Sequence, residues 1–515
     1  MSSLAQFLPR RRFVVSLASA CAALALSACG AAAPPTTAVS TGATARALAS
    51  TTSAAALSSA IASTAASTAA ATSGGAAGAT VAAVAATTSA LTTAGLTLHT
   101  PSSPKATIRF SSWGTLTSQT VPIFNAFMAQ HPDIAINFDT IGTFSEYFSK
   151  VQLQTASGAG PDVITHSPYY HVVFAAKKVT RVLDDLVARD KVDLTQLYPP
   201  LVASARWQAG RIATGAGQLY VMPANLNTGS LHFYNKTLFQ QAGVQPPDAS
   251  WTWDTMLENA MKMTRAAGAN GNPQYGLGLP EDGNGRINTW IWQNGGDFFD
   301  QNFTQCTLRS DGKAYDAFTY LVDLVHKQKV AAAPSTGDRI KLFTSGAAAM
   351  TPGGMWWSQT IAPTPSLDWD VFLPPKSPTT GSRVIDVYTN GFSIGSTSKF
   401  VDEGWTFVKW YTMGEGLPLE IANIPGFVPA HIATAEKYVF NPQRTTPPKS
   451  IYLFSDVLKN GHVTFVVAGE GDIASAIGKP QTDAFSGAQA LDAAATTIQQ
   501  QVTSILNQQR AQLGL

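Results

Sequence analysis

The chain has 515 residues, of which 45% are hydrophobic and 13% are charged, and its formal net charge is +2 at pH 7. At roughly 150 residues per domain, this length predicts two or three domains with ample core. The near balance of 34 basic and 32 acidic residues argues against a nucleic-acid partner. Three cysteines without a CxxC pair indicate neither a zinc site nor a disulfide framework, so we expect no metal and no cofactor.

The first residues have the pattern of an export signal. Three arginines, Arg10, Arg11 and Arg12, precede an apolar run that ends in small residues at Ala28. The run is too short for a comfortable membrane span. We therefore expect a signal peptide over residues 1–28. Twin-arginine export and general secretory export both remain open.

A cysteine follows this run directly. The residues Leu26, Ser27, Ala28 and Cys29 resemble a bacterial lipobox, in which the cysteine becomes the lipidated first residue of the mature protein. The alternative is an ordinary signal cleavage near Ala28 beside a chance cysteine. Because the cysteine stands at the right place relative to the apolar run, we favour lipidation of Cys29. The expected location is then the outer face of the cell membrane, with the protein exported and held there by its lipid.

A long tract of low complexity comes next. Up to about residue 104 it consists of Ala, Thr, Ser and Gly with almost no charged residues. Such a composition cannot bury enough apolar surface to offset the entropy of ordering the chain. We expect a disordered tether over residues 29–105.

The first folded segment alternates strands and helices. The pattern predicts strands at 107–110 and 134–138, a helix with Val121, Phe124 and Met128 on one stripe, and a second helix at 146–155. This alternation is typical of an α/β domain with a mostly parallel sheet. Ligands bind beyond the carboxyl ends of such strands, which singles out the loops 111–115 and 165–171.

A polar interruption between two apolar strands marks the next segment. Residues 220–239 read as a strand, an interruption at 225–229, and a second strand at 230–234. A segment of this kind can carry the chain from one lobe to another, with Asn227 and Thr228 at the crossing. Small-molecule sites form preferentially in clefts between lobes.

Several sequence blocks, in order, identify a family. They are SGAGPDVI at 157–164, YVMP at 220–223, HFYNKTLFQQAG at 232–243, WTWD at 251–254, WQNGGD at 292–297, FTSGAAAM at 343–350 and NGFSI at 390–394. Together they resemble the extracellular solute-binding proteins of family 1, the carbohydrate-capturing components of ABC importers that include maltose-binding proteins. The resemblance covers about residues 106–515.

The resemblance implies a fold and a function. The fold would be α/β and two-lobed, like periplasmic binding proteins, with a mixed, mostly parallel sheet in each lobe and hinge crossings between the lobes. Lobe one would comprise 106–227 and 391–438, and lobe two 229–389 and 439–515. The protein would be a monomeric binding protein that captures a sugar or oligosaccharide by hinge closure and delivers it to a membrane permease. It would not be an enzyme.

Sugar recognition needs flat aromatic faces and side chains that satisfy hydroxyl groups. By resemblance, Trp356 matches the tryptophan that stacks on sugar in the maltose-binding group. For any single tryptophan the alternative is core packing. No acidic residue stands in the first crossing, so the sugar stays open. The candidate ligand-binding residues are Trp113, Gly114, His166, Ser167, Tyr169, Asn227, Thr228, Trp290, Trp292, Trp356, Asn390, Gly426 and Phe427.

A secreted α/β hydrolase or another carbohydrate-active enzyme is the alternative function. Residues 391–395 match the G-x-S-x-G pattern around Ser393, and Asp456 and His462 follow in hydrolase order. A nucleophile elbow requires a helix directly after the serine, whereas here the next helix is expected near Val401. Glycoside hydrolysis needs two carboxylates in the cleft, and the ligand loops offer at most Asp282 and Asp297. The binding protein is therefore the favoured function.

Overall fold

The computed structural model describes residues 90–93, 96–266, 272–280, 284–334, 338–424, 426–459, 461–463 and 466–515. All of them belong to one compact unit, 83–515. The expected signal peptide, Cys29 and most of the expected tether lie outside these residues. Within the described ranges, none of the helices combines the length and the apolar character that crossing a membrane requires.

The first sheet has five strands in the order β4-β3-β5-β14-β8. Their bounds are β4 (Ile134–Thr140), β3 (Ala106–Ser112), β5 (Val163–His166), β14 (Gly391–Ile394) and β8 (Met222–Pro223). The flanking helices and turns are α1 (Val121–Gln130), α2 (Phe144–Ala156), η1 (Pro168–Tyr170), α3 (His171–Ala176), α4 (Asp184–Arg189), η2 (Leu194–Gln196), α5 (Pro199–Ser204), α12 (Val401–Met413), α13 (Gly416–Asn423) and α14 (Ile432–Tyr438).

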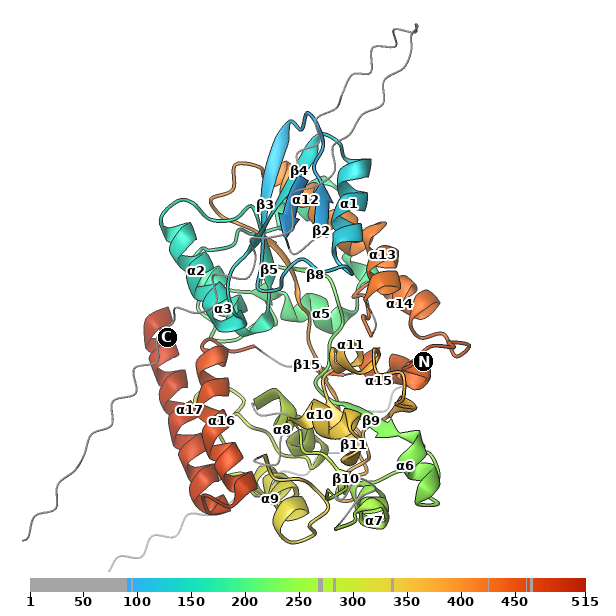
Figure 1. The fold of residues 1–515 in the computed structure, drawn as a ribbon. Coiled ribbons are helices and arrows are strands. Elements are labelled where there is room, and N and C mark those ends of the chain that lie inside the picture. Colours follow the sequence, from blue (N-terminus) through green and yellow to red (C-terminus); the bar gives the residue numbers. More distant parts are fainter. Residues whose placement is uncertain are drawn as a thin grey trace, which may run out of the picture. The chain divides into compact units, whose positions relative to one another are not determined.

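The second sheet has four strands in the order β10-β11-β9-β12. Their bounds are β10 (Tyr275–Leu277), β11 (Ala348–Gly353), β9 (Leu231–Asn235) and β12 (Trp369–Phe372). Around it lie α6 (Lys236–Gln241), α7 (Trp253–Met263), α8 (Asn284–Gln293), α9 (Gly312–His326), α10 (Arg339–Thr344), α11 (Trp357–Ile361), η4 (Lys449–Phe454) and α15 (Ser455–Lys459). The chain closes with α16 (Glu470–Ser486) and α17 (Leu491–Leu513), which pack side by side and against α9 (Figure 1).

The expectation of mostly parallel sheets is wrong. In the first sheet β3 pairs in parallel with β4 and β5, but β14 pairs antiparallel with β5 and β8. In the second sheet only β10 and β11 are parallel. The antiparallel strands β8, β9 and β14 adjoin the crossings, where the chain enters or leaves a sheet without the helical crossover that a parallel neighbour needs. The mixed α/β fold class itself is as expected.

Two crossing segments join the sheets, as the sequence predicted. The chain leaves the first sheet after β8 and enters the second at β9, and it returns before β14. The crossings pair with each other, since Asn227 N–H donates to Tyr388 O over 2.8 Å and Asn390 N–H donates to Asn225 Oδ1 over 2.9 Å. Backbone approach is tight at the return, because a Cβ added at Gly391 would lie 2.3 Å from Met222 O. Glycine fits that position for this reason.

Ordered structure begins earlier in the chain than expected. Strands β1 (Ala90–Thr93) and β2 (Leu96–His99) form an antiparallel hairpin within the range expected to be tether. The amide of Asn125 on α1 donates to Thr97 O over 3.1 Å and accepts from His99 N–H over 2.8 Å. Leu98 is buried in the same core as α1. This local pairing and its contacts with α1 give structure to residues that composition alone assigned to the tether.

Candidate functional site

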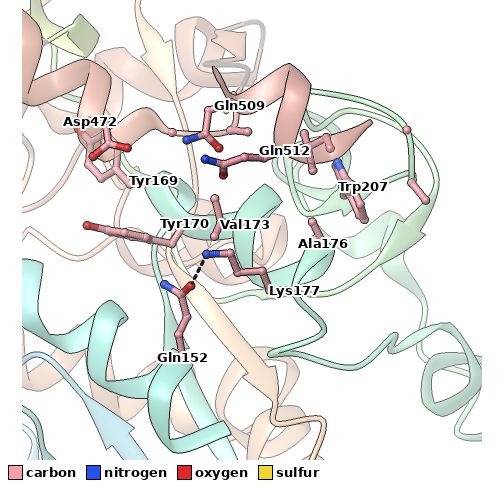
Figure 2. Close-up of a pocket in the computed structure, with 16 residues that line it drawn as sticks. Gln152, Tyr169, Tyr170, Val173, Ala176, Lys177, Trp207, Asp472, Gln509 and Gln512 are labelled. Atoms are coloured by element: carbon pink, nitrogen blue, oxygen red, sulfur yellow. Dashed lines mark hydrogen bonds between the residues drawn. The ribbon is translucent and has the colours of Figure 1, made fainter. Parts of the chain in front are cut away.

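Two of the cavities lined by described residues carry Trp, Tyr or Phe rings in their walls, and the larger of these two has a volume of about 540 Å³. It lies between η1, α2 and α3 on one side and α16 and α17 on the other, and Figure 2 shows the side chains of both groups around it. Three aromatic residues line it, Tyr169, Tyr170 and Trp207. The polar side chains along it are Gln152, Lys177, Asp472, Gln509 and Gln512.

Packing fixes the aromatic wall of this larger cavity. The Tyr170 ring stacks on Phe148 of α2 with ring centroids 3.8 Å apart. Burial and, to a lesser extent, the negative charge of Asp472 raise the pKa of Tyr170. Lys177 Nζ donates to Gln152 Oε1 over 3.1 Å (Figure 2). The cavity thus combines ring surfaces with amide, ammonium and carboxylate groups, the mixture that binds polyhydroxylated solutes.

The smaller cavity has a volume of about 320 Å³. Its walls carry ring surfaces, two carboxylates, two amides and a guanidinium group, from Trp292, Phe299, Phe303, His462, Asp297, Asp300, Asn288, Gln301 and Arg211. Trp292 Nε1–H donates to Asp297 Oδ1 over 3.2 Å, which orients the indole. Asp300 accepts hydrogen bonds from Thr304 and Gln305, so its carboxylate also stabilises the loop at 300–305.

A paired backbone strip contributes Ala468 to the lining of the larger cavity and Thr214 to that of the smaller one. Thr214 N–H donates to Val466 O over 3.0 Å, and Ala468 N–H donates to Ile212 O over 2.8 Å. Residues beside this strip line the larger cavity at Trp207 and the smaller one at Arg211. The strip therefore positions walls of both cavities.

The structure places the predicted ligand residues in two groups. Half-buried residues are Trp113, Gly114, Tyr169, Asn227, Trp292, Trp356, Asn390 and Gly426. Buried residues are His166, Ser167, Thr228, Trp290 and Phe427, with at most 9% of their surface exposed. Tyr169 lines the larger cavity and Trp292 the smaller one. Sequence reasoning singled out the loop 165–171 but not its residue Tyr170, which also lines the larger cavity. It missed Trp207 and Asp472, because these residues reach the cavity from segments that carry no family block.

Trp113 and Trp290 both pack against other aromatic rings. Trp113 makes edge contacts with Phe144 and Tyr147 of α2, with ring centroids 5.3 and 5.6 Å apart. Trp290 is 3% exposed and lies 5.1 Å from the ring of Trp253. Trp290 therefore contributes to the core around α8, whereas Trp113 keeps part of its surface at the end of β3.

The paired tryptophans have different environments. Trp357 is 1% exposed and lies over Phe233 of the second sheet, whereas Trp356 is half-buried. The loop at Gly426 adjoins this segment, because a Cβ on Gly426 would lie 2.5 Å from Ser358 Cβ, and the φ of Gly426 is +74°. The structure thus brings the predicted residues Trp356 and Gly426 into one neighbourhood.

Ser393 is not arranged as a nucleophile. Its hydroxyl is buried on β14 and donates to Tyr220 O over 2.8 Å. Since a hydroxyl has one proton, His166 Nδ1, 3.0 Å away, must donate to Ser393 rather than accept from it. Burial, and then the neighbouring His171, hold the pKa of His166 well below its ordinary value. The next helix starts only at Val401, so the nucleophile elbow is absent.

No acidic residue stands in the first crossing itself, but a carboxylate from a distant segment contacts it. Asp386 is fully buried, and its Oδ1 accepts from Thr228 Oγ1 over 2.9 Å. No local pattern predicts this contact because the two residues are 158 positions apart. Within the described residues, no group of three His, Cys, Asp or Glu side chains is arranged to hold a metal ion.

The model of the bacterial extracellular solute-binding proteins matches residues 113–413, which include strands of both sheets and both crossings. The chain belongs to this family. The family is one of solute-binding proteins rather than of enzymes. Binding proteins of Brucella abortus and Brucella suis are 24% identical over 292 residues, which are 54% of this chain and 65% of each relative.

Solved solute-binding proteins share the fold. An ABC substrate-binding protein of Listeria monocytogenes, in complex with cycloalternan, is 23% identical with a TM-score of 0.67, covering 78% of this chain and 99% of that one. The GacH receptor of Streptomyces glaucescens is 20% identical with a TM-score of 0.64, covering 78% and 98%. A cyclic α-maltosyl-1,6-maltose binding protein of Arthrobacter globiformis is 18% identical with a TM-score of 0.63, covering 79% and 100%.

Proposed function

We propose that this solute-binding protein captures a sugar or oligosaccharide and delivers it to the permease of an ABC importer. The observation that carries the proposal is the larger cavity, where tyrosine and tryptophan rings face amide and charged groups from α16 and α17. The solutes named for the solved relatives, cycloalternan, acarbose and a cyclic maltosyl-maltose, are all carbohydrates and support the same class.

Capture would proceed by hinge closure. The proposed lobes are 106–227 with 391–438 and 229–389 with 439–515. The division is supported by the sheets, each of which draws strands from segments on its own side of the crossings. Closure would turn the chain near Asn227 and Asn390, and sugar-binding proteins that close around a ligand are the standard case of hinge motion. The solute must bind the closed form better, or it cannot shift the population.

The half-buried members of the predicted set would contact the solute. Trp113, Tyr169, Trp292 and Trp356 offer ring surface, and Asn227 and Asn390 offer amides at the crossings. The buried members His166, Ser167, Thr228, Trp290 and Phe427 would hold these residues in place. The secreted hydrolase is not proposed, because the family is one of binding proteins and Ser393 donates its only proton to a carbonyl.

A glycan-library screen tests the function, followed by calorimetry and small-angle scattering with the best-bound glycan. We expect one-site binding, a smaller radius of gyration with glycan, and a melting temperature that rises with its concentration. Binding of no glycan in the library, with tight binding of a different solute class, would refute the sugar assignment. Tight glycan binding without compaction would refute hinge closure while leaving the sugar assignment standing.

The proposed cellular form is an exported monomer, lipid-anchored through Cys29 to the outer face of the membrane. Support comes from the lipobox resemblance at 26–29 and from the family, whose members are extracellular. Mass spectrometry of the mature protein should find Cys29 at the amino terminus with acyl chains. An unmodified Cys29 thiol in the mature protein would overturn the anchor.

A further inference from the structure

Asp386 on β13 (Asp386–Val387) holds the first crossing through several hydrogen bonds. Besides the Thr228 hydroxyl, it accepts from Gly229 N–H over 3.0 Å and from Ser230 Oγ over 2.5 Å. Its side chain has no exposed surface. Burying a carboxylate costs free energy unless hydrogen-bond donors satisfy its oxygens. Moving one of these donors away would leave a buried oxygen without its partner, so the network holds the donors of the crossing as well as the carboxylate in place.

The same network continues to α8. Ser230 Oγ lies 2.5 Å from Thr289 Oγ1. Because the proton of Ser230 goes to Asp386, the hydroxyl of Thr289 donates to Ser230. One turn further along α8, Gln293 Nε2 donates to Val384 O over 2.9 Å. The helix is therefore tied to the Asp386 segment at two points on one face.

A third connection runs from β13 to the wall of the smaller cavity. β13 pairs with β15 (His462–Val463), where His462 N–H donates to Ile385 O over 2.9 Å. The imidazole of His462 stacks on Trp292 of α8 with ring centroids 4.0 Å apart. Trp292, His462 and Asn288 all line the smaller cavity. The wall of the smaller cavity and the first crossing are thus connected through one continuous set of hydrogen bonds and ring contacts.

We propose that Asp386 is a positioning residue that locks the crossing at 228–230 to α8. Rotation of the chain at 225–227 and 388–390 then carries Trp292 and Asn288 as one unit. The inference rests on the proposed solute capture for its functional meaning. The mechanical coupling between the crossing and α8 is measurable without any solute.

Hydrogen exchange on the folded, solute-free protein tests the coupling. Asp386→Asn keeps the shape of the side chain but replaces one acceptor oxygen with an NH₂ group, which cannot accept the hydrogen bonds that the crossing donates. We expect exchange about tenfold faster or more both in peptides covering 226–231 and in peptides covering 286–293. Thr289→Val removes only the hydroxyl group that joins Ser230 to α8. It should speed exchange in α8, while exchange at the crossing stays as in the wild type.

Asp370→Asn is the matched control. Asp370 of β12 is also a buried carboxylate, and accepts from Ser450 N–H and Ser450 Oγ, each over 2.9 Å. Its ion-pair partner is Lys236 at the start of α6, 3.6 Å away, so faster exchange should stay near β12, α6 and η4. If Asp386→Asn loosens the crossing and leaves α8 no faster than the control does, the proposal is wrong. Equal loosening of α8 by both variants would also overturn it.

A binding arm uses maltose and cycloalternan as probes. If the wild type binds either, Asp386→Asn should raise its Kd about tenfold, and Asp370→Asn should leave the Kd within about twofold. An unchanged Kd in Asp386→Asn would show that the hydrogen bonds of Asp386 to the crossing do not contribute to solute binding. If the wild type binds neither probe nor any library glycan, the sugar proposal fails, and the exchange result still decides whether Asp386 couples the crossing to α8.

Discussion

The indole of Trp292 on α8 and the imidazole of His462 on β15 form a stacked pair, with ring centroids 4.0 Å apart and ring planes inclined by 17°. Both residues line the smaller cavity, so the pair makes part of its wall. The pair also joins α8 to the short β13–β15 ladder beside the crossing. If the Trp292–His462 stack joins the cavity wall to the crossing, the two residues should show a measurable energetic coupling.

The first prediction is the size of this coupling. A double-mutant cycle of Trp292→Ala and His462→Ala, followed by denaturant unfolding, should give an interaction energy of about 0.5–1.5 kcal/mol, as for other aromatic pairs. The control cycle combines Trp292→Ala with His326→Ala, because His326 bonds to Ala484 O at the end of α9. That second cycle should be additive within about 0.5 kcal/mol. Additivity in the first cycle would contradict the stack.

The second prediction separates the adjacent tryptophans. Trp356→Ala should weaken binding of the identified glycan by about 2 kcal/mol or more, because aromatic anchors dominate such sites. Trp357→Ala should instead lower the free energy of unfolding by about 3–5 kcal/mol, because that ring is 1% exposed and fills the core over Phe233. Calorimetry and thermal melts of both variants decide. Normal binding by Trp356→Ala would show that the ring is not in the site.

The third prediction concerns Ser393. Ser393→Ala should leave glycan affinity unchanged and lower the free energy of unfolding by about 1–3 kcal/mol, because Tyr220 O and His166 Nδ1 lose a buried partner. The control is Ser396→Ala, which removes the hydroxyl of an exposed serine that donates to Lys178 O over 2.5 Å. Hydrolysis of any glycan by the wild type, abolished in Ser393→Ala, would contradict the assignment as a binding protein.

The fourth prediction is a pH dependence. Burial lowers the pKa of His171 to about 3, whereas an unfolded chain has an ordinary histidine pKa near 6.5. The unfolded state therefore binds more protons between these values, and stability falls as the pH drops below about 6.5. Each pH unit in that window removes about 1.4 kcal/mol through this group.

Equilibrium unfolding between pH 7 and pH 5 tests the dependence by comparing the wild type with His171→Gln. The difference between the two proteins should shrink toward lower pH, because only the wild type loses the contribution of His171. Its closest titrating neighbour is His166, whose ring centroid lies 5.1 Å away, so the double variant with His166→Gln completes the measurement. Burial raises the pKa of Glu470 to about 8, which acts in the opposite direction with rising pH and cancels in the comparison. Parallel curves would refute the prediction.

The sequence by itself determined the order of elements, the crossings and the family. Apolar periodicity and a polar interruption are local signals, so β9 and the crossing at Asn227 followed from short stretches. The helix cap of α7 shows how short such local contacts are, because the Thr252 side chain accepts from Thr255 N–H, three residues further on. Several blocks in family order extended these local signals over both sheets.

Only the tertiary structure decided which distant side chains meet. Asp386 accepts a hydrogen bond from Thr228, 158 positions away in the sequence. His462 is placed beside Trp292 by the two-residue pairing of β15 with β13. Neither contact has a local pattern, because each depends on how the two sheets and the crossings pack. The same holds for the neighbours Trp356 and Trp357, identical in type and adjacent in sequence, where the helix α11 turns one ring into the core and leaves the other half-buried. Burial of a side chain follows from its direction on a packed element, which composition and spacing do not encode.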